Sequence, residues 1–186
     1  MTAIAILEAD APLLGLWDRS SPANKPGHYD EAWDAAWEFD RDPPYGAGWK
    51  HEDMEIACEH LDQYWNHRQA RGELMVWKPG SGVYKVELRL LQPKPKTKFS
   101  KPQRQAFLVG QGVERILVCA SGDLIVSSLR GLGSREAKVL LRVHPGKYRV
   151  GMDVRRDQLA RVRPFKSAAD YPKSQGPDFV IFLQNK

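Results

Sequence analysis

The sequence predicts an α+β fold that is mainly β: an antiparallel β-sandwich or open barrel with one or two N-terminal helices. Three observations support this fold class. Apolar residues recur with helical spacing in two segments before residue 73, and with a period of two in several short segments after it. Turn residues separate most of the later segments. The strands do not alternate with helices, which argues against a parallel α/β sheet.

The first helix is predicted over residues 28–40, between two proline-containing breaks. Its aromatic residues recur every four positions and therefore share one face: Tyr29, Trp33 and Trp37. Carboxylates recur with the same period on the neighbouring face: Asp30, Asp34 and Glu38. We expect the rings to face the protein interior, packed on the sheet, and the carboxylates to face solvent.

A second helix is predicted over residues 52–70 and is expected to end at Gly72. Its apolar side is expected to consist of Ile56, Leu61, Tyr64 and Trp65.

The most regular strand is predicted over residues 83–91, where apolar and charged side chains alternate. Its buried face is expected to carry Tyr84, Val86, Leu88 and Leu90. Residues 74–77 precede it across Pro79-Gly80-Ser81-Gly82, which predicts a hairpin between the two segments. Further strands are expected over residues 106–109, 113–120, 124–129, 138–143, 147–154 and 179–183.

The chain has 186 residues, enough to bury a core without disulfides, and a single domain over 1–186 is expected. Its charge is uneven, because residues 1–66 hold 14 Asp and Glu against four Lys and Arg, whereas residues 67–186 hold nine against 24. The domain is therefore divided into an acidic, helix-containing part (1–72) and a basic, β-rich part (73–186). An acidic segment that neutralises a basic one within the same domain is one interpretation; contact with a charged macromolecule is the other.

No apolar run is long enough to span a membrane, and the N-terminal segment carries Glu8 and Asp10 without a basic leader. The two cysteines, Cys58 and Cys119, lie in different segments and predict no disulfide framework. A cytoplasmic protein with reduced thiols and no membrane contact is expected.

The sequence contains no recognisable catalytic or cofactor motif, and we predict a non-enzymatic protein without catalytic residues, metal or cofactor. The best metal candidates, His60 and His67, are seven residues apart, whereas two zinc ligands on one helix prefer a spacing of four. Acidic neighbours of Cys58 disfavour its thiolate, and Cys119 lies in an apolar run. An enzyme whose site is assembled from residues without a motif is the least favoured alternative.

Two basic loops, residues 92–104 and 155–177, favour nucleic-acid binding as one possible function. In the first loop the candidate phosphate contacts are Lys94, Lys96, Lys98, Lys101 and Arg104. Lysines in such loops also keep strand edges soluble, so the pattern is consistent with either role.

Three segments carry a resemblance to a known family: Tyr29-Asp-Glu-Ala32, a hairpin over residues 114–129, and an apolar strand, Pro-Gly turn and Tyr-containing strand over 138–150. Together they resemble the competence protein J-like nuclease inhibitors of bacteria and, more loosely, immunity proteins that neutralise antibacterial toxins. Residues 41–72 and the basic second part depart from that pattern.

The resemblance implies a non-enzymatic bacterial protein that binds and inhibits a cognate toxin or effector, a nuclease among the candidates, encoded by a neighbouring gene. The surface expected to face that partner consists of Asp30, Glu31, Asp34 and Glu38 beside Trp33 and Trp37. Carboxylates steer the encounter with a basic surface and aromatic rings anchor it, which is the physical basis for choosing these residues.

Overall fold

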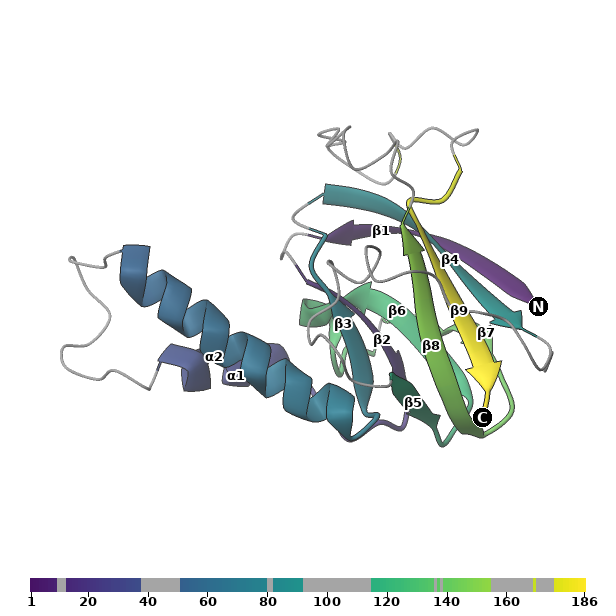
Figure 1. Cartoon of the computed structure of the whole chain (residues 1–186), viewed down its shortest axis with the longest axis horizontal. Helices are drawn as coiled ribbons and strands as arrows, with labels where there is room; N and C mark the ends of the chain where they lie inside the picture. Colours follow the sequence, from purple (N-terminus) through teal and green to yellow (C-terminus); the bar gives the residue numbers. More distant parts are fainter. Residues whose placement is uncertain are drawn as a thin grey trace.

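The computed structural model describes residues 1–9, 13–37, 51–79, 82–91, 115–135, 137, 139–154, 169 and 176–186. These residues form two α-helices, one 3-10 turn and nine strands (Figure 1). The elements in chain order are β1 (Thr2–Ala9), β2 (Leu14–Asp18), α1 (His28–Trp37), α2 (His51–Ala70), β3 (Leu74–Trp77), β4 (Gly82–Leu91), β5 (Ile116–Cys119), β6 (Asp123–Ser128), η3 (Leu129–Gly131), β7 (Val139–Arg142), β8 (Gly146–Val154) and β9 (Phe179–Asn185).

The strands form two sheets that pack face to face. The five-stranded sheet has the order β1-β4-β9-β8-β5, and the four-stranded sheet has the order β3-β2-β6-β7. Neighbouring strands are antiparallel except β4 and β9, which run parallel. The α+β fold, mainly β and with a sandwich at its centre, is therefore confirmed.

The helices form a third layer that packs on the outer face of the four-stranded sheet, and the N-terminal part of α2 extends beyond the sheets (Figure 1). Successive residues of β2 and β3 point alternately into two apolar cores. Leu16 and Met75 face the five-stranded sheet, whereas Trp17 and Val76 face the helices. Because both faces are buried, these strands are apolar at almost every position, and the alternation of apolar and polar residues that marks a half-exposed strand is absent.

Strand β4 shows the predicted alternation. Val86 and Leu88 are fully buried between the sheets, and Tyr84 and Leu90 pack against the same core. The predicted hairpin between residues 74–77 and 83–91 is wrong, because β3 pairs with β2 while β4 pairs with β1 and β9. The chain crosses from one sheet to the other between β3 and β4, which lets the two strands bury their side chains against each other.

The predicted hairpin over residues 114–129 is also wrong in its pairing. β5 pairs with β8 in the five-stranded sheet, and β6 pairs with β2 and β7 in the other sheet. The turn that joins them is held by Asp18 at the end of β2, whose carboxylate accepts backbone hydrogen bonds from Ser121 (3.1 Å) and Gly122 (2.9 Å). Asp18 also accepts bonds from Ser20 and from the Ser121 hydroxyl, and thereby ties the two sheets together at this corner.

The Asp18 side chain is fully buried. Burial raises the pKa of its carboxyl, but the hydrogen bonds from Ser20 and Ser121 outweigh burial and hold the pKa below its usual value. This carboxylate is therefore ionised in the folded protein, and among the described residues its charge is distributed over five hydrogen-bond donors.

Helix α2 ends in a Schellman motif, in which Gly72 adopts the left-handed conformation at φ 73°. Gly72 donates its backbone N–H to the Gln69 carbonyl (2.9 Å), and Glu73 donates to the Arg68 carbonyl (3.1 Å). The predicted end of this helix is confirmed. The motif reverses the chain and brings the Glu73 side chain back beside Arg68, with which it forms an ion pair.

Candidate functional site: the α1–α2 surface

Helix α1 has one buried and one exposed face. Tyr29, Ala32 and Ala36 are buried, and the Tyr29 ring stacks on Trp65 of α2 with the ring centroids 6.4 Å apart. Trp33 is partly buried against the same core, in an edge contact with Tyr29. The aromatic side of this helix faces inward as expected, but its main partner is α2 together with the sheet rather than the sheet alone.

The opposite side of α1 is exposed and carries the acidic face, which we define as Asp30, Glu31 and Asp34. Asp30 and Glu31 lie in the first turn, where the helix dipole favours negative charge. No ion pair joins the acidic face to any residue that the structure describes. The acidic face is thus a negative surface without internal compensation among the described residues.

The predicted partner-binding residues are therefore only partly brought together. Asp30, Glu31 and Asp34 share the exposed side, and Trp33 lies at its inner edge. Glu38 and the side chain of Trp37 lie outside the described residues. The alternative nucleic-acid contacts also lie outside them: Lys94, Lys96, Lys98, Lys101 and Arg104.

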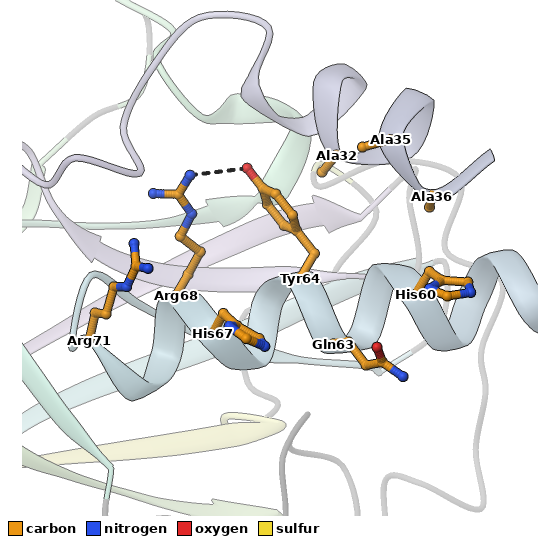
Figure 2. A pocket seen from close by; sticks show the side chains of 9 residues that line it. All are labelled: Ala32, Ala35, Ala36, His60, Gln63, Tyr64, His67, Arg68 and Arg71. Carbon is orange, nitrogen blue, oxygen red and sulfur yellow. Dashed lines mark hydrogen bonds between the residues drawn. The ribbon is translucent and has the colours of Figure 1, made fainter. Parts of the chain in front are cut away.

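Beside the acidic face lies a groove between the two helices, with a volume of about 390 Å³ (Figure 2). Its α1 wall consists of Ala32, Ala35 and Ala36, whose small side chains leave the space open. Its α2 wall consists of His60, Gln63, Tyr64, His67, Arg68 and Arg71. We refer to this feature as the α1–α2 groove.

A chain of hydrogen bonds starts in the protein interior and ends in the groove. The buried His28 ring contacts the Ala23 carbonyl through Nδ1 (2.7 Å) and the Tyr64 hydroxyl through Nε2. Because a carbonyl only accepts, Nδ1 carries a proton and donates it to Ala23, while Nε2 is hydrogen-bonded to the Tyr64 hydroxyl. Arg68 in turn donates from Nη2 to the Tyr64 oxygen (3.2 Å), the contact drawn in Figure 2.

The guanidinium of Arg68 is fixed at both ends. Its Nη1 lies 2.8 Å from Glu73 Oε2, and its Nη2 donates to Tyr64. Burial lowers the pKa of Arg68, but the hydrogen bonds that its guanidinium donates to Glu73 and Tyr64 outweigh burial and leave the pKa raised. Arg68 is therefore a permanent, oriented cation at the edge of the groove.

From the sequence, His60 and His67 of this wall are predicted only as metal candidates, and Tyr64 only as part of the apolar side of the helix. The six residues recur at positions i, i+3, i+4, i+7, i+8 and i+11, which places them on one helix face. Among the described residues no group of three or more His, Cys, Asp or Glu side chains is arranged to hold a metal ion. One expectation for α2 is wrong: Ile56 is 45% exposed, because it lies on the helix face of His60 and Gln63 and not on the buried face of Ala57 and Leu61.

Neither cysteine is placed as a nucleophile. Cys119 is fully buried in the sandwich, where burial and the nearby Asp18 carboxylate raise the pKa of its thiol to about 12. Cys58 lies on α2 beside Ala57 and does not line the groove. None of the helices formed by the described residues has the length and apolar character that crossing a membrane requires.

No known family model matches this chain, and no curated protein sequence is similar to it. Among solved structures, the chain is similar to the protein described as crocagin biosynthetic gene J, with a TM-score of 0.61 and 21% sequence identity. The match covers 100% of this chain and 97% of the other, and at that identity it establishes a shared fold alone.

A second match is ComJ from Bacillus subtilis, an inhibitor of the DNA-degrading activity of NucA, with a TM-score of 0.40, 9% identity, and coverage of 98% of this chain and 95% of ComJ. The resemblance to competence protein J-like inhibitors is thereby confirmed as a weak and partial one.

Proposed function

We propose that this chain is a non-enzymatic, immunity-type inhibitor that binds a basic effector protein through the acidic face of α1. The observation that carries the proposal is the exposure of Asp30, Glu31 and Asp34 on a helix whose other side is buried. The inward side fixes the helix on α2 through Tyr29, so the carboxylates are held in place before any partner arrives. A preorganised surface loses little conformational entropy on binding, which favours affinity.

A nuclease is the effector class that fits this surface best. Such an enzyme presents a basic surface to phosphates, and a row of carboxylates on a rigid helix can occupy that surface in their place. Side chains four residues apart on a helix, such as Asp30 and Asp34, have Cβ atoms about 5–6 Å apart. Opposite charges also accelerate the encounter, which is valuable to an inhibitor that must act before the effector damages the cell.

The test is binding between this chain and the protein encoded by the neighbouring gene, with the variant Asp34→Lys. Asp34 is exposed, and a lysine there lies four residues from Asp30, where opposite charges support a helix. We expect the variant to fold normally and to bind at least about 30-fold more weakly, the equivalent of about 2 kcal/mol for a lost interfacial charge pair.

The matched control is Glu8→Lys on β1, which changes the net charge identically on the five-stranded sheet. Cells that express the effector should survive with the parent and with Glu8→Lys, and should die with Asp34→Lys. If Asp34→Lys binds and protects as well as the parent, the acidic face is only a solvated helix surface. If the parent binds no neighbour-encoded protein, the inhibitor function is wrong.

A further inference from the structure

Two arginines share one carboxylate beside the groove. Arg68 Nη1 lies 2.8 Å from Glu73, and Arg71 Nη1 lies 3.9 Å from the other oxygen of the same carboxylate. Among the described residues Glu73 is the only acidic partner of either guanidinium. The Glu73 side chain is 11% exposed and is engaged with Arg68, whereas Arg71 is 66% exposed. The cluster therefore has one positive charge in excess, and that charge faces solvent.

The groove beside this excess charge is suited to an anion of limited size. Its alanine wall leaves about 390 Å³ open, and Gln63 and His67 add N–H donors along the same helix face as Arg71. The glutamate and Tyr64 hold Arg68 in one orientation, so its remaining N–H groups have a fixed direction. Guanidinium groups recognise carboxylates through paired hydrogen bonds, which gives such a site geometric selectivity.

The carboxylates of helix α1 restrict the class of anion that can bind in the groove. Ala35 of the groove wall lies on α1 between the groove and the carboxylates of the acidic face, Glu31 and Asp34 among them. A polyanion such as nucleic acid would bring further negative charges against these carboxylates, which costs binding energy. A protein segment can place a single carboxylate in the groove and a basic residue beside it, so that both helices meet the opposite charge.

We propose that the α1–α2 groove binds an acidic side chain of a protein partner, next to basic partner residues that contact the acidic face. The partner surface is therefore mixed in charge, with an acidic residue seated among basic ones. The identity of this segment as part of the inhibited effector rests on the proposed function, whereas the preference of the groove for a carboxylate does not.

The carboxylate preference can be tested on the isolated chain by NMR titration with three probes: a capped tetraglutamate peptide, its tetraglutamine counterpart, and an oligothymidylate of the same net charge. We expect saturable shifts of the Gln63, His67 and Arg71 amides with tetraglutamate and none with tetraglutamine. Oligothymidylate should bind at least about tenfold more weakly at these residues, because the acidic face repels it. Equal shifts with tetraglutamine, or tighter binding of oligothymidylate, would overturn the proposal.

Two variants locate the binding. Ala35→Trp fills the groove without changing charge, and Arg71→Gln removes the solvent-facing cation; both positions are exposed. Each should weaken tetraglutamate binding about tenfold or more. Lys147→Gln on β8, an exposed cation on the five-stranded sheet, should have no effect. Unchanged affinity in both groove variants would show that the peptide binds elsewhere and would overturn the assignment of the groove.

These outcomes are separable from those of the effector test. If tetraglutamate binds in the groove but no neighbour-encoded protein binds, the proposed function fails and the carboxylate site stands. If the effector binds and Asp34→Lys abolishes binding, while Ala35→Trp and Arg71→Gln bind the effector as well as the parent, the groove proposal fails and the inhibitor function stands.

Discussion

The two faces of the four-stranded sheet pack against different kinds of neighbour. On one face Leu16, Met75 and Val126 meet the five-stranded sheet in a core of aliphatic and aromatic side chains. On the other face Trp17 and Val76 meet the helices. The helical layer also contains polar groups, since the chain from His28 through Tyr64 to Arg68 leads from the interior to the surface.

On the proposed function, this difference assigns stability to the sandwich and recognition to the helical layer. The sandwich core exposes almost none of its side chains and serves to hold the sheets together. The helical layer uses its inner side for packing and its outer side to present charge, with carboxylates on α1 and cations on α2. We therefore expect substitutions on the inner side of the helices to change stability, and substitutions on their outer side to change binding.

The largest effect is expected for Trp65→Ala, at the centre of the helical layer. Trp65 is fully buried and contacts His28, Tyr29 and Tyr64. Its loss should lower the free energy of unfolding by about 3–5 kcal/mol, measured by denaturant titration.

The matched substitution in the sandwich is Leu88→Ala, which should cost about 2–5 kcal/mol. We propose that the chain is a single domain, in which case calorimetry should show one unfolding transition for both variants. Separate melting of the helices in Trp65→Ala, with the sandwich intact, would instead make the helical layer an independent unit.

The next effect concerns Asp18, which links the two sheets. Asp18→Asn keeps the shape of the side chain but removes the charge and one acceptor, so we expect a loss of about 1.5–3 kcal/mol at neutral pH. Because the pKa of Asp18 is lowered in the folded state, its contribution is present above the unfolded pKa and is lost as the pH falls through the folded pKa.

Stability of the parent should therefore fall more steeply in acid than stability of Asp18→Asn, and the two curves should converge at low pH. Unfolding by urea at a series of pH values measures both curves. A constant gap between them down to low pH would show that the hydrogen bonds of Asp18 do not depend on its charge.

A smaller effect is expected for Tyr64→Phe, which keeps the ring and removes the hydroxyl. The buried Nε2 of His28 loses its hydrogen-bond partner, and Arg68 loses one of its acceptors. We expect a loss of about 0.5–1.5 kcal/mol in the free energy of unfolding. Weaker tetraglutamate binding should accompany it, because Arg68 is less firmly oriented. Unchanged stability would show that the network does not contribute to the fold.

The sequence predicts well the elements that have a clear internal period, whereas β1, β2 and the pairing of the strands are not predicted. The alternation in β4 correctly identifies Val86 and Leu88 as core residues, and Gly72 correctly marks the end of α2. β2 was not predicted, because Leu-Gly-Leu-Trp has two buried faces and lacks a period of two. Pairing was also missed, since β4 and β9 lie side by side although they are distant in the chain.

In the candidate site, too, the sequence predicts what lies within one helix and not the contacts between elements. The separation of rings and carboxylates on α1 follows from helical spacing and is confirmed for Tyr29, Asp30 and Asp34. The groove depends on the approach of Ala35 to the cationic face of α2 and on the return of Glu73 to Arg68. These are contacts between elements, which the spacing within one element cannot predict.

Both proposals place the partner on the outer side of the helical layer. Amide hydrogen exchange of the chain, alone and bound to the neighbour-encoded protein, tests this placement most directly. We expect slower exchange in the complex for residues 30–36 of α1 and 60–71 of α2, with β1 and β8 unchanged. Protection confined to the strands of the five-stranded sheet, with both helices unaffected, would contradict it.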